Sequence, residues 1–211
     1  MKDKFFQDLR ENIKPYFESH KGHGFDHTER VYNLAIKISK KENADMDVVK
    51  IAALLHDIAR MKEEENEEIC HAEEGAKMAE KVLIEMNFPK EKTEKVIHAI
   101  SVHRFSKGLK AETREAEILQ DADRLDALGA IILARVFMRS GARGMIMYDP
   151  KIEPEKEYHG QDTNAINHIY EKILKIKPET FKTEKARKIA KKRYAFVEKF
   201  LKQFKNEWEG K

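Results

Sequence analysis

The sequence contains very little cysteine, proline and glycine for its 211 residues. It has one cysteine, five prolines and nine glycines. A single cysteine, Cys70, cannot form an internal disulfide, so a disulfide scaffold is excluded and a reducing cytoplasm is compatible with the chain. Charged residues make up 37% and hydrophobic residues 41% of the chain. This composition favours a soluble helical protein over a β-sandwich or a disordered chain.

Long hydrophobic runs and a strong net charge are also missing. No apolar segment approaches the roughly 20 residues that span a bilayer, and residues 1–8 lack the apolar core of a secretory signal. We therefore expect a cytoplasmic protein that does not enter a membrane. The 41 basic and 38 acidic residues leave a net charge of only +3. The protein as a whole therefore lacks the strong positive electrostatic field that would indicate nucleic acid as a partner.

Apolar residues recur at helical spacing through most of the chain. They predict helices at about 3–19, 26–42, 47–60, 71–88, 91–105, 113–140 (as one helix or two), 163–177 and 184–208. The expected fold is an all-α bundle of about eight or nine helices in a single domain, 1–211, which the helices of 163–211 close.

Three further stretches differ from the rest of the chain in composition. Residues 141–162 contain several turn residues and form the longest expected loop, a candidate lid over a substrate. The acidic stretch 62–68 is most simply a solvated loop or helix face. Basic residues gather at 182–193, but Glu184 interrupts them and no aromatic side chains are interleaved for stacking, so a solvated face is preferred to nucleic-acid binding.

Histidine is concentrated in the first half of the chain, where seven of the nine lie between positions 20 and 103. His56 and Asp57 are adjacent in an apolar segment, and charged groups in such surroundings are paired, hydrogen-bonded or bound to metal. Taken alone, the pair is more simply interpreted as an ordinary buried histidine beside a capping carboxylate. Asp26 is expected to cap the second helix, which places His27 in its first turn and close to a loop.

Further candidates follow along the chain. His71 is expected to start a helix. His103 lies on the apolar stripe of its helix and His98 does not, so His103 is preferred as an inward residue. In the next helix three carboxylates lie within six residues, and they cannot all face one way. Periodicity does not decide between Asp121 and Asp123, because both lie on partly apolar stripes.

The order of His27, then His56-Asp57, then Asp123 resembles the H…HD…D signature of the HD-domain superfamily of metal-dependent phosphohydrolases. The surrounding residues 24–31, 52–58 and 120–130 are similar to small stand-alone HD hydrolases of bacteria and archaea. The resemblance implies an HD-domain helical bundle in which these four residues, from 27 to 123, bind a metal. It also favours Asp123, because the family's ligand directly precedes an Arg/Lys-Leu pair.

Some members of this superfamily bind a second metal through histidines that follow the His-Asp pair. His71 and His103 resemble those positions, although this match is looser. A catalytic or phosphate-contacting role for the two histidines is preferred to a second metal, and a structural role is the third alternative.

The resemblance implies a metal-dependent phosphohydrolase that acts on a nucleotide or a related small phosphate ester. Two imidazoles and two carboxylates suit Mn, Fe, Co, Ni or Zn better than an all-oxygen Mg site, although Mg is not excluded. A divalent cation lowers the pKa of bound water towards about 7 and neutralises charge on phosphoryl oxygens. Asp57 can orient or deprotonate that water, and His71 or His103 can stabilise phosphoryl oxygens or protonate the leaving group.

Arginines are the expected contacts to phosphate, because guanidinium groups bind it bidentately. The candidates are Arg60, Arg124 and Arg143, and a surface salt bridge is the alternative for each of them. The runner-up functions are a phosphodiesterase that acts on cyclic nucleotides or RNA ends, a catalytically silent metal-binding nucleotide sensor, and a metal-independent helical adaptor. A homodimer is compatible with the sequence, since dimers are the commonest soluble assembly.

Overall fold

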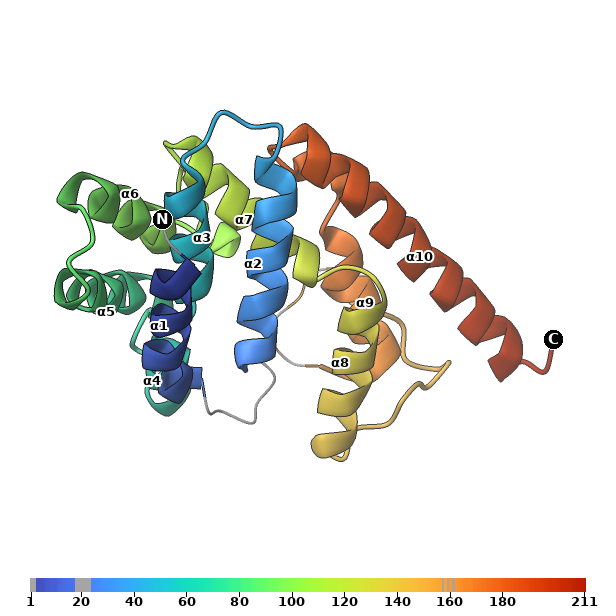
Figure 1. The fold of residues 1–211 in the computed structure, drawn as a ribbon. Helices are drawn as coiled ribbons and strands as arrows, with labels where there is room; N and C mark the ends of the chain where they lie inside the picture. Colours follow the sequence, from blue (N-terminus) through green and yellow to red (C-terminus); the bar gives the residue numbers. More distant parts are fainter. Residues whose placement is uncertain (1–2, 18–23, 157, 159, 161) are drawn as a thin grey trace. The chain divides into compact units, whose positions relative to one another are not determined.

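The computed structural model describes residues 3–17, 24–156, 158, 160 and 162–211. Within this part all regular elements are helical and no strand occurs (Figure 1), which confirms the all-α prediction. The residues group into two compact units, 1–123 and 124–211. His20 and His23 lie outside the described residues, and the single-domain organisation stays a prediction.

The first unit is built around α3, a helix that is buried on nearly every side. Its elements are α1 (Asp3–Ile13), α2 (Phe25–Ser39), α3 (Met46–Leu55), α4 (Arg60–Glu65), α5 (His71–Glu85), α6 (Lys90–Ser101) and most of α7 (Arg114–Asp126), with short 3-10 helices at Lys14–Phe17 and Phe105–Lys107. Helix α3 packs against α1, α2 and α6, and α5 packs against α6 (Figure 1). Seven of the ten residues of α3 are buried, which is typical of a helix that is hydrophobic all round.

Helix α3 ends at Leu55, so the prediction of a continuous helix to residue 60 was wrong. The Nδ1–H of His56 donates to the carbonyl of Ala53 at 2.9 Å, which satisfies a carbonyl oxygen at the end of the helix. Two tight turns follow, in which the backbone N–H of Ile58 donates to Leu55 and that of Arg60 donates to Asp57. His56 and Asp57 therefore lie at the exit of α3, at the point where the chain changes direction.

The starts of α2 and α3 are capped differently. Asp45 caps α3 through its side chain, which accepts from the backbone N–H groups of Asp47 and Val48. The expected cap of α2 by Asp26 was wrong, because Gly24 occupies the N-cap position. Asp26 lies in the first turn, where the helix dipole stabilises a carboxylate, and it pairs with Arg30 at 2.6 Å. His27 is in the first turn of α2, as predicted.

The second unit consists of helices that pack against one another and against the long helix α10. Its elements are α8 (Ala130–Ala142), α9 (Ala165–Glu171) and α10 (Glu184–Trp208), with 3-10 helices at Ile173–Lys175 and Pro178–Thr180. Helix α8 packs against both α9 and α10. The expected helix of 113–140 is two helices, because Gly129 has a φ of +95°, a conformation that glycine adopts readily and that breaks the helix.

The predicted loop of 141–162 follows α8 and is hydrogen-bonded to α9 where the structure describes it. The backbone N–H of Glu155 donates to Glu171, and the side chain of Asn167 donates to the carbonyl of Ile152. Residues 157, 159 and 161 of this loop lie outside the described part, and its role as a lid stays a prediction. Over the described ranges of the whole chain, no helix combines the length and low charge that a bilayer crossing requires.

Candidate metal centre

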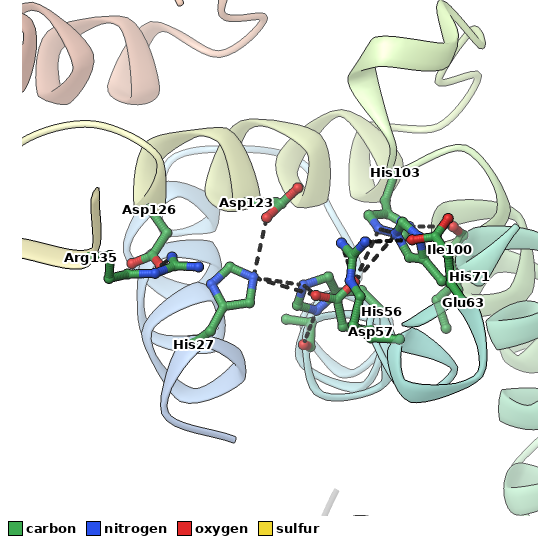
Figure 2. Close-up of polar contacts among 12 residues, drawn as sticks. His27, His56, Asp57, Glu63, His71, Ile100, His103, Asp123, Asp126 and Arg135 are labelled. Atoms are coloured by element: carbon green, nitrogen blue, oxygen red, sulfur yellow. Dashed lines mark hydrogen bonds and ion pairs between the residues drawn. The ribbon is translucent and has the colours of Figure 1, made fainter. Parts of the chain in front are cut away.

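Three buried side chains form a first cluster at the end of α3. His27 comes from the first turn of α2, and His56 and Asp57 follow α3. The Nε2 atoms of the two histidines are 3.3 Å apart, and Asp57 Oδ2 lies 3.7 Å from each of them (Figure 2). All three residues are at most 3% exposed. His27 lies 29 positions before His56 in the sequence, and the fold places its Nε2 next to the ligand-type atoms of His56 and Asp57.

Helix α7 adds a second carboxylate to this cluster. Asp123 Oδ1 lies 3.4 Å from His27 Nε2 (Figure 2), and the Asp123 side chain is 30% exposed. Periodicity had left Asp121 and Asp123 open. The structure shows that Asp123 is the one that reaches His27. Burial alone would raise the pKa of Asp123, but the hydrogen bond and charge of His27 outweigh burial, so the net shift is downward.

A second cluster lies on the other oxygen of Asp57. His71, the first residue of α5, and His103, just after α6, place their Nε2 atoms 3.3 Å from each other. Asp57 Oδ1 is 3.5 Å from the Nε2 of His71 and 3.7 Å from that of His103 (Figure 2). Both histidines are 1% exposed. Asp57 therefore presents one oxygen to each pair of histidines.

The hydrogen bonds of the rings fix which nitrogen atoms carry protons. His56 Nδ1 contacts the carbonyl of Ala53, and His103 Nδ1 contacts the carbonyl of Ile100 at 2.7 Å. A carbonyl oxygen only accepts, so each Nδ1 is the protonated nitrogen, and in a neutral ring the Nε2 then carries a lone pair. His71 has the same arrangement, because its Nδ1 contacts a carboxylate oxygen of Glu63 at 2.7 Å.

This donor set fits a cation. Bonds of about 2.1 Å from nitrogen or oxygen to a first-row metal place neighbouring ligand atoms roughly 3.0 to 3.4 Å apart, close to the spacings of both clusters. Without a cation, the lone pairs of His71 and His103 would face each other beside a carboxylate oxygen. In addition, Asp57 Oδ2 is buried and has no hydrogen-bond partner in the part of the chain that the structure describes, which is costly unless a cation compensates it.

The surroundings of Asp57, His56 and His71 favour the protonation states that bind metal, an ionised carboxylate and neutral imidazoles. Burial alone would raise the pKa of Asp57, but His56 and Arg60 overcome this effect and lower it well below its usual value. Burial lowers the pKa of His56. Burial and the nearby charge of Arg60 together lower the pKa of His71 to about 4. At neutral pH the structure thus offers an ionised carboxylate and neutral imidazoles.

Comparison with known proteins agrees with this geometry. Residues 24–128 match the model of the HD domain. The chain is also 33% identical to the uncharacterized protein YpgQ of Bacillus subtilis. The alignment spans 193 residues and covers 90% of this chain and 86% of YpgQ. The chain belongs to the HD-domain family. Divalent metals are the ions that HD domains bind, and both clusters are built from residues that can hold one.

Solved structures are similar to this chain over nearly its whole length. An HD-superfamily hydrolase from Bacillus thuringiensis is 34% identical and superposes with a TM-score of 0.78, covering 99% of this chain and 97% of that one. B. subtilis YpgQ in complex with ADP is 30% identical in its structural alignment and has a TM-score of 0.74, covering 97% and 95% of the two chains.

Two charged residues of α4, Arg60 and Glu63, lie beside the two clusters. Arg60 donates to Glu63 at 2.7 Å and to Asp57 Oδ1 at 3.4 Å. Glu63 in addition accepts from His71 and from Arg104. The prediction that 62–68 is merely a solvated stretch was therefore wrong for Glu63, whose side chain is only 17% exposed. No local signal in the sequence could have identified Glu63.

The other two arginines that were predicted to bind substrate have partners within the second unit. Arg124 is buried, donates to the carbonyl and hydroxyl of Thr180, and lies 4.4 Å over the ring of Phe181. Arg143 ends α8, where it is half-exposed and lies 3.5 Å from Asp162. Roles of these two residues in substrate binding stay predictions.

We expect the metal-free HD-domain protein to lose stability as the pH falls below about 6.5. The pKa of His71 is about 4 in the folded state and 6.5 as a free side chain, so the unfolded chain binds the proton first and acid favours unfolding. The difference corresponds to about 2 kcal/mol between pH 7 and pH 5, and the loss levels off below about pH 4. Denaturant unfolding at several pH values in the presence of a chelator would measure this loss of unfolding free energy. His71→Gln should reduce the pH dependence but not remove it, because burial also lowers the pKa of His56. His98→Gln should leave the profile unchanged, and equal profiles for both variants would contradict the prediction.

Proposed function

We propose that this protein is a metal-dependent phosphohydrolase that acts on a nucleotide or a related small phosphate ester. The observation that carries the proposal is the convergence of His27, His56, Asp57 and Asp123, with contacts of 3.3 to 3.7 Å between their ligand atoms. These four residues would hold the catalytic cation. When bound, such a cation lowers the pKa of water and neutralises charge on phosphoryl oxygens.

Asp57 is the residue that we assign to the water. Its carboxylate is ionised, because its pKa is held well below the usual value, and it is 1% exposed. An ionised carboxylate in this place can accept a hydrogen bond from water and orient it toward phosphorus. Arg60, which contacts Asp57 Oδ1 at 3.4 Å, supplies positive charge on the same side, where phosphoryl oxygens would gather.

The hydrogen bonds of His71 and His103 favour a second cation over direct contact with phosphate. Each Nδ1 is bound to an acceptor within the protein, so a neutral ring has only a lone pair left at Nε2. A lone pair can bind a metal but cannot donate to a phosphoryl oxygen. His71 stays neutral at pH 7, since its pKa is about 4. We therefore assign both histidines, with Asp57 Oδ1, to a second divalent cation.

This second cluster favours one alternative function. If both clusters held a cation, with Asp57 contributing one oxygen to each, the two charges would stabilise the oxygens of a phosphodiester during hydrolysis. A phosphodiesterase that acts on cyclic nucleotides or RNA ends is therefore the second candidate. It gains support if two metals are bound per chain and phosphodiesters are hydrolysed faster than phosphate monoesters and nucleoside diphosphates.

The nucleotide class rests on the relatives. YpgQ, which is 33% identical to this chain, was crystallised in complex with ADP. We extend to this chain the binding of a nucleoside phosphate, with ADP as the first compound to test. The absence of a membrane-spanning helix from the described part of the chain and the lone Cys70 fit the proposed cytoplasmic location.

The test is metal analysis of the purified protein, followed by a screen of nucleotides and phosphate esters with Mn, Co, Ni, Mg and Zn. We expect stoichiometric metal and phosphate release that chelator abolishes. His56→Ala should lower hydrolysis by about a hundredfold or more, and His98→Ala, in which the lost histidine lies outside both clusters, should not. Metal and ADP binding without any hydrolysis would instead indicate a catalytically silent sensor, and the absence of metal would leave a helical adaptor.

A further inference from the structure

Glu63 is a carboxylate that binds three different partners of the metal centre. Its Oε2 accepts from His71 Nδ1 at 2.7 Å (Figure 2). The same Oε2 accepts from Arg60 at 2.7 Å, and Oε1 accepts from Arg104 at 2.7 Å. The partners come from α4, from the first residue of α5 and from the turn after α6. One side chain thus joins three segments, and the farthest partner, Arg104, lies 41 positions from Glu63 in the sequence.

The contact between Glu63 and His71 decides which nitrogen of His71 carries the proton. His71 lies between two carboxylates, and its N–H points to the nearer one: Glu63 Oε2 is 2.7 Å from Nδ1, at hydrogen-bond distance, whereas Asp57 Oδ1 is 3.5 Å from Nε2. The Nε2 of His71 then turns its lone pair toward Asp57 Oδ1, at 3.5 Å, and toward His103 Nε2, at 3.3 Å. Without Glu63, either tautomer of His71 would be accessible.

The contact between Glu63 and Arg104 acts on the other histidine. Arg104 directly follows His103, just after the end of α6. The ion pair therefore anchors the short segment that carries His103, while the carbonyl of Ile100 fixes its ring through Nδ1. Both histidines of the second cluster are in this way held by the same carboxylate, one directly and one through its neighbour.

We propose that Glu63 is a positioning residue that prepares His71 and His103 for a second divalent cation. The inference rests on the proposed function, whose second cluster it concerns, and it assigns Glu63 no contact with the cation or the substrate. Carboxylates that orient a metal-binding histidine typically contribute 10- to 100-fold to metal affinity. Glu63 should contribute to the second cation only, because it contacts neither His27 nor His56.

Three variants test this role. Glu63→Ala removes all three contacts. Glu63→Gln keeps the size of the side chain and a carbonyl that can still accept from His71, but its amide cannot accept from Arg104. Glu74→Ala is the matched control, because Glu74 is also a carboxylate that links α4 and α5, through an ion pair with Lys62 at 2.7 Å, and it does not contact the histidines.

Titration with Mn²⁺ by calorimetry and native mass spectrometry would count the cations and measure each affinity. We expect two cations per wild-type chain. In Glu63→Ala the second should bind about 10- to 100-fold more weakly, with the first changed by less than about twofold. Glu63→Gln should lie between Glu63→Ala and wild type, and Glu74→Ala should match wild type.

Nitrogen-15 spectra of the histidine side chains in the metal-free protein provide a readout that a merely structural role would not change. The His71 ring should carry its proton on Nδ1 alone in wild type and should become a mixture of tautomers in Glu63→Ala. An unchanged tautomer or an unchanged second affinity in Glu63→Ala would overturn the proposal. If Glu63→Ala does not fold, an affinity of Glu63→Gln equal to that of wild type would overturn it.

Hydrolysis of ADP separates this inference from the proposed function. A wild-type protein that binds one cation and still hydrolyses a phosphate ester would overturn the role of Glu63 and leave the function intact. A protein that binds two cations, loses the second in Glu63→Ala and hydrolyses none of the phosphate esters would overturn the function and support the role of Glu63.

Discussion

Replacing Asp57 with Asn should abolish cation binding at both clusters and lower phosphate-ester hydrolysis by about a thousandfold or more. Asp57 is the residue whose two carboxylate oxygens face different histidine pairs, Oδ2 toward His27 and His56 and Oδ1 toward His71 and His103. Asparagine has nearly the same shape but no charge, and its amide nitrogen cannot bind a cation. The change therefore removes the negative charge that offsets the cation in each cluster.

The measurement is a cation titration together with the thermal stability of the protein with and without metal. A ligand at 100 times its dissociation constant stabilises the folded state by about 2.7 kcal/mol, and Asp57→Asn should lose this stabilisation. Asp47→Asn is the matched control on α3, because Asp47 is half-buried and pairs with Lys92 away from both clusters. Two cations bound with wild-type affinity in Asp57→Asn would refute the assignment of both sites.

The parts of this site that could be predicted are those that local sequence carries. Polar residues with a fixed order and distinctive neighbours identified His27, His56, Asp57 and Asp123, and apolar periodicity located most helices. The end of α3 at Leu55 could not be predicted in this way. Residues 51–59 are all buried, so the apolar pattern runs on unchanged from the helix into the turns that follow it.

Glu63 was missed for a different reason. It belongs to a run of acidic residues at 62–68, and such runs are most often solvated. What makes Glu63 different is its set of partners, His71 and Arg104, which lie 8 and 41 positions further along the chain. The tertiary fold brings them together, and no spacing rule within the run separates Glu63 from its neighbours Glu64 and Glu65.

Replacing Arg60 with Gln should have the opposite effect on metal affinity from Asp57→Asn. Arg60 is 21% exposed in its side chain and lies beside two carboxylates, at 3.4 Å from Asp57 and 2.7 Å from Glu63. In the metal-free protein its charge compensates theirs, and its loss should destabilise the fold by about 3 kcal/mol. Bound cations take over this compensation, so the cost should be smaller in the metal-loaded protein. By linkage, Arg60→Gln should then bind cations more tightly, by about tenfold.

Denaturant unfolding with and without Mn²⁺, together with a cation titration, would measure both sides of this linkage. Arg114→Gln is a suitable control, because Arg114 also pairs with two carboxylates, Glu42 and Glu117, but lies away from the clusters. The loss of stability in Arg114→Gln should be the same with and without metal.

The kinetics of Arg60→Gln then test the predicted contact of Arg60 with phosphate: tighter metal binding combined with a lower kcat/KM would support that contact. Weaker cation binding in Arg60→Gln would show that the guanidinium supports the metal site instead of competing with the cation for the charge of Asp57.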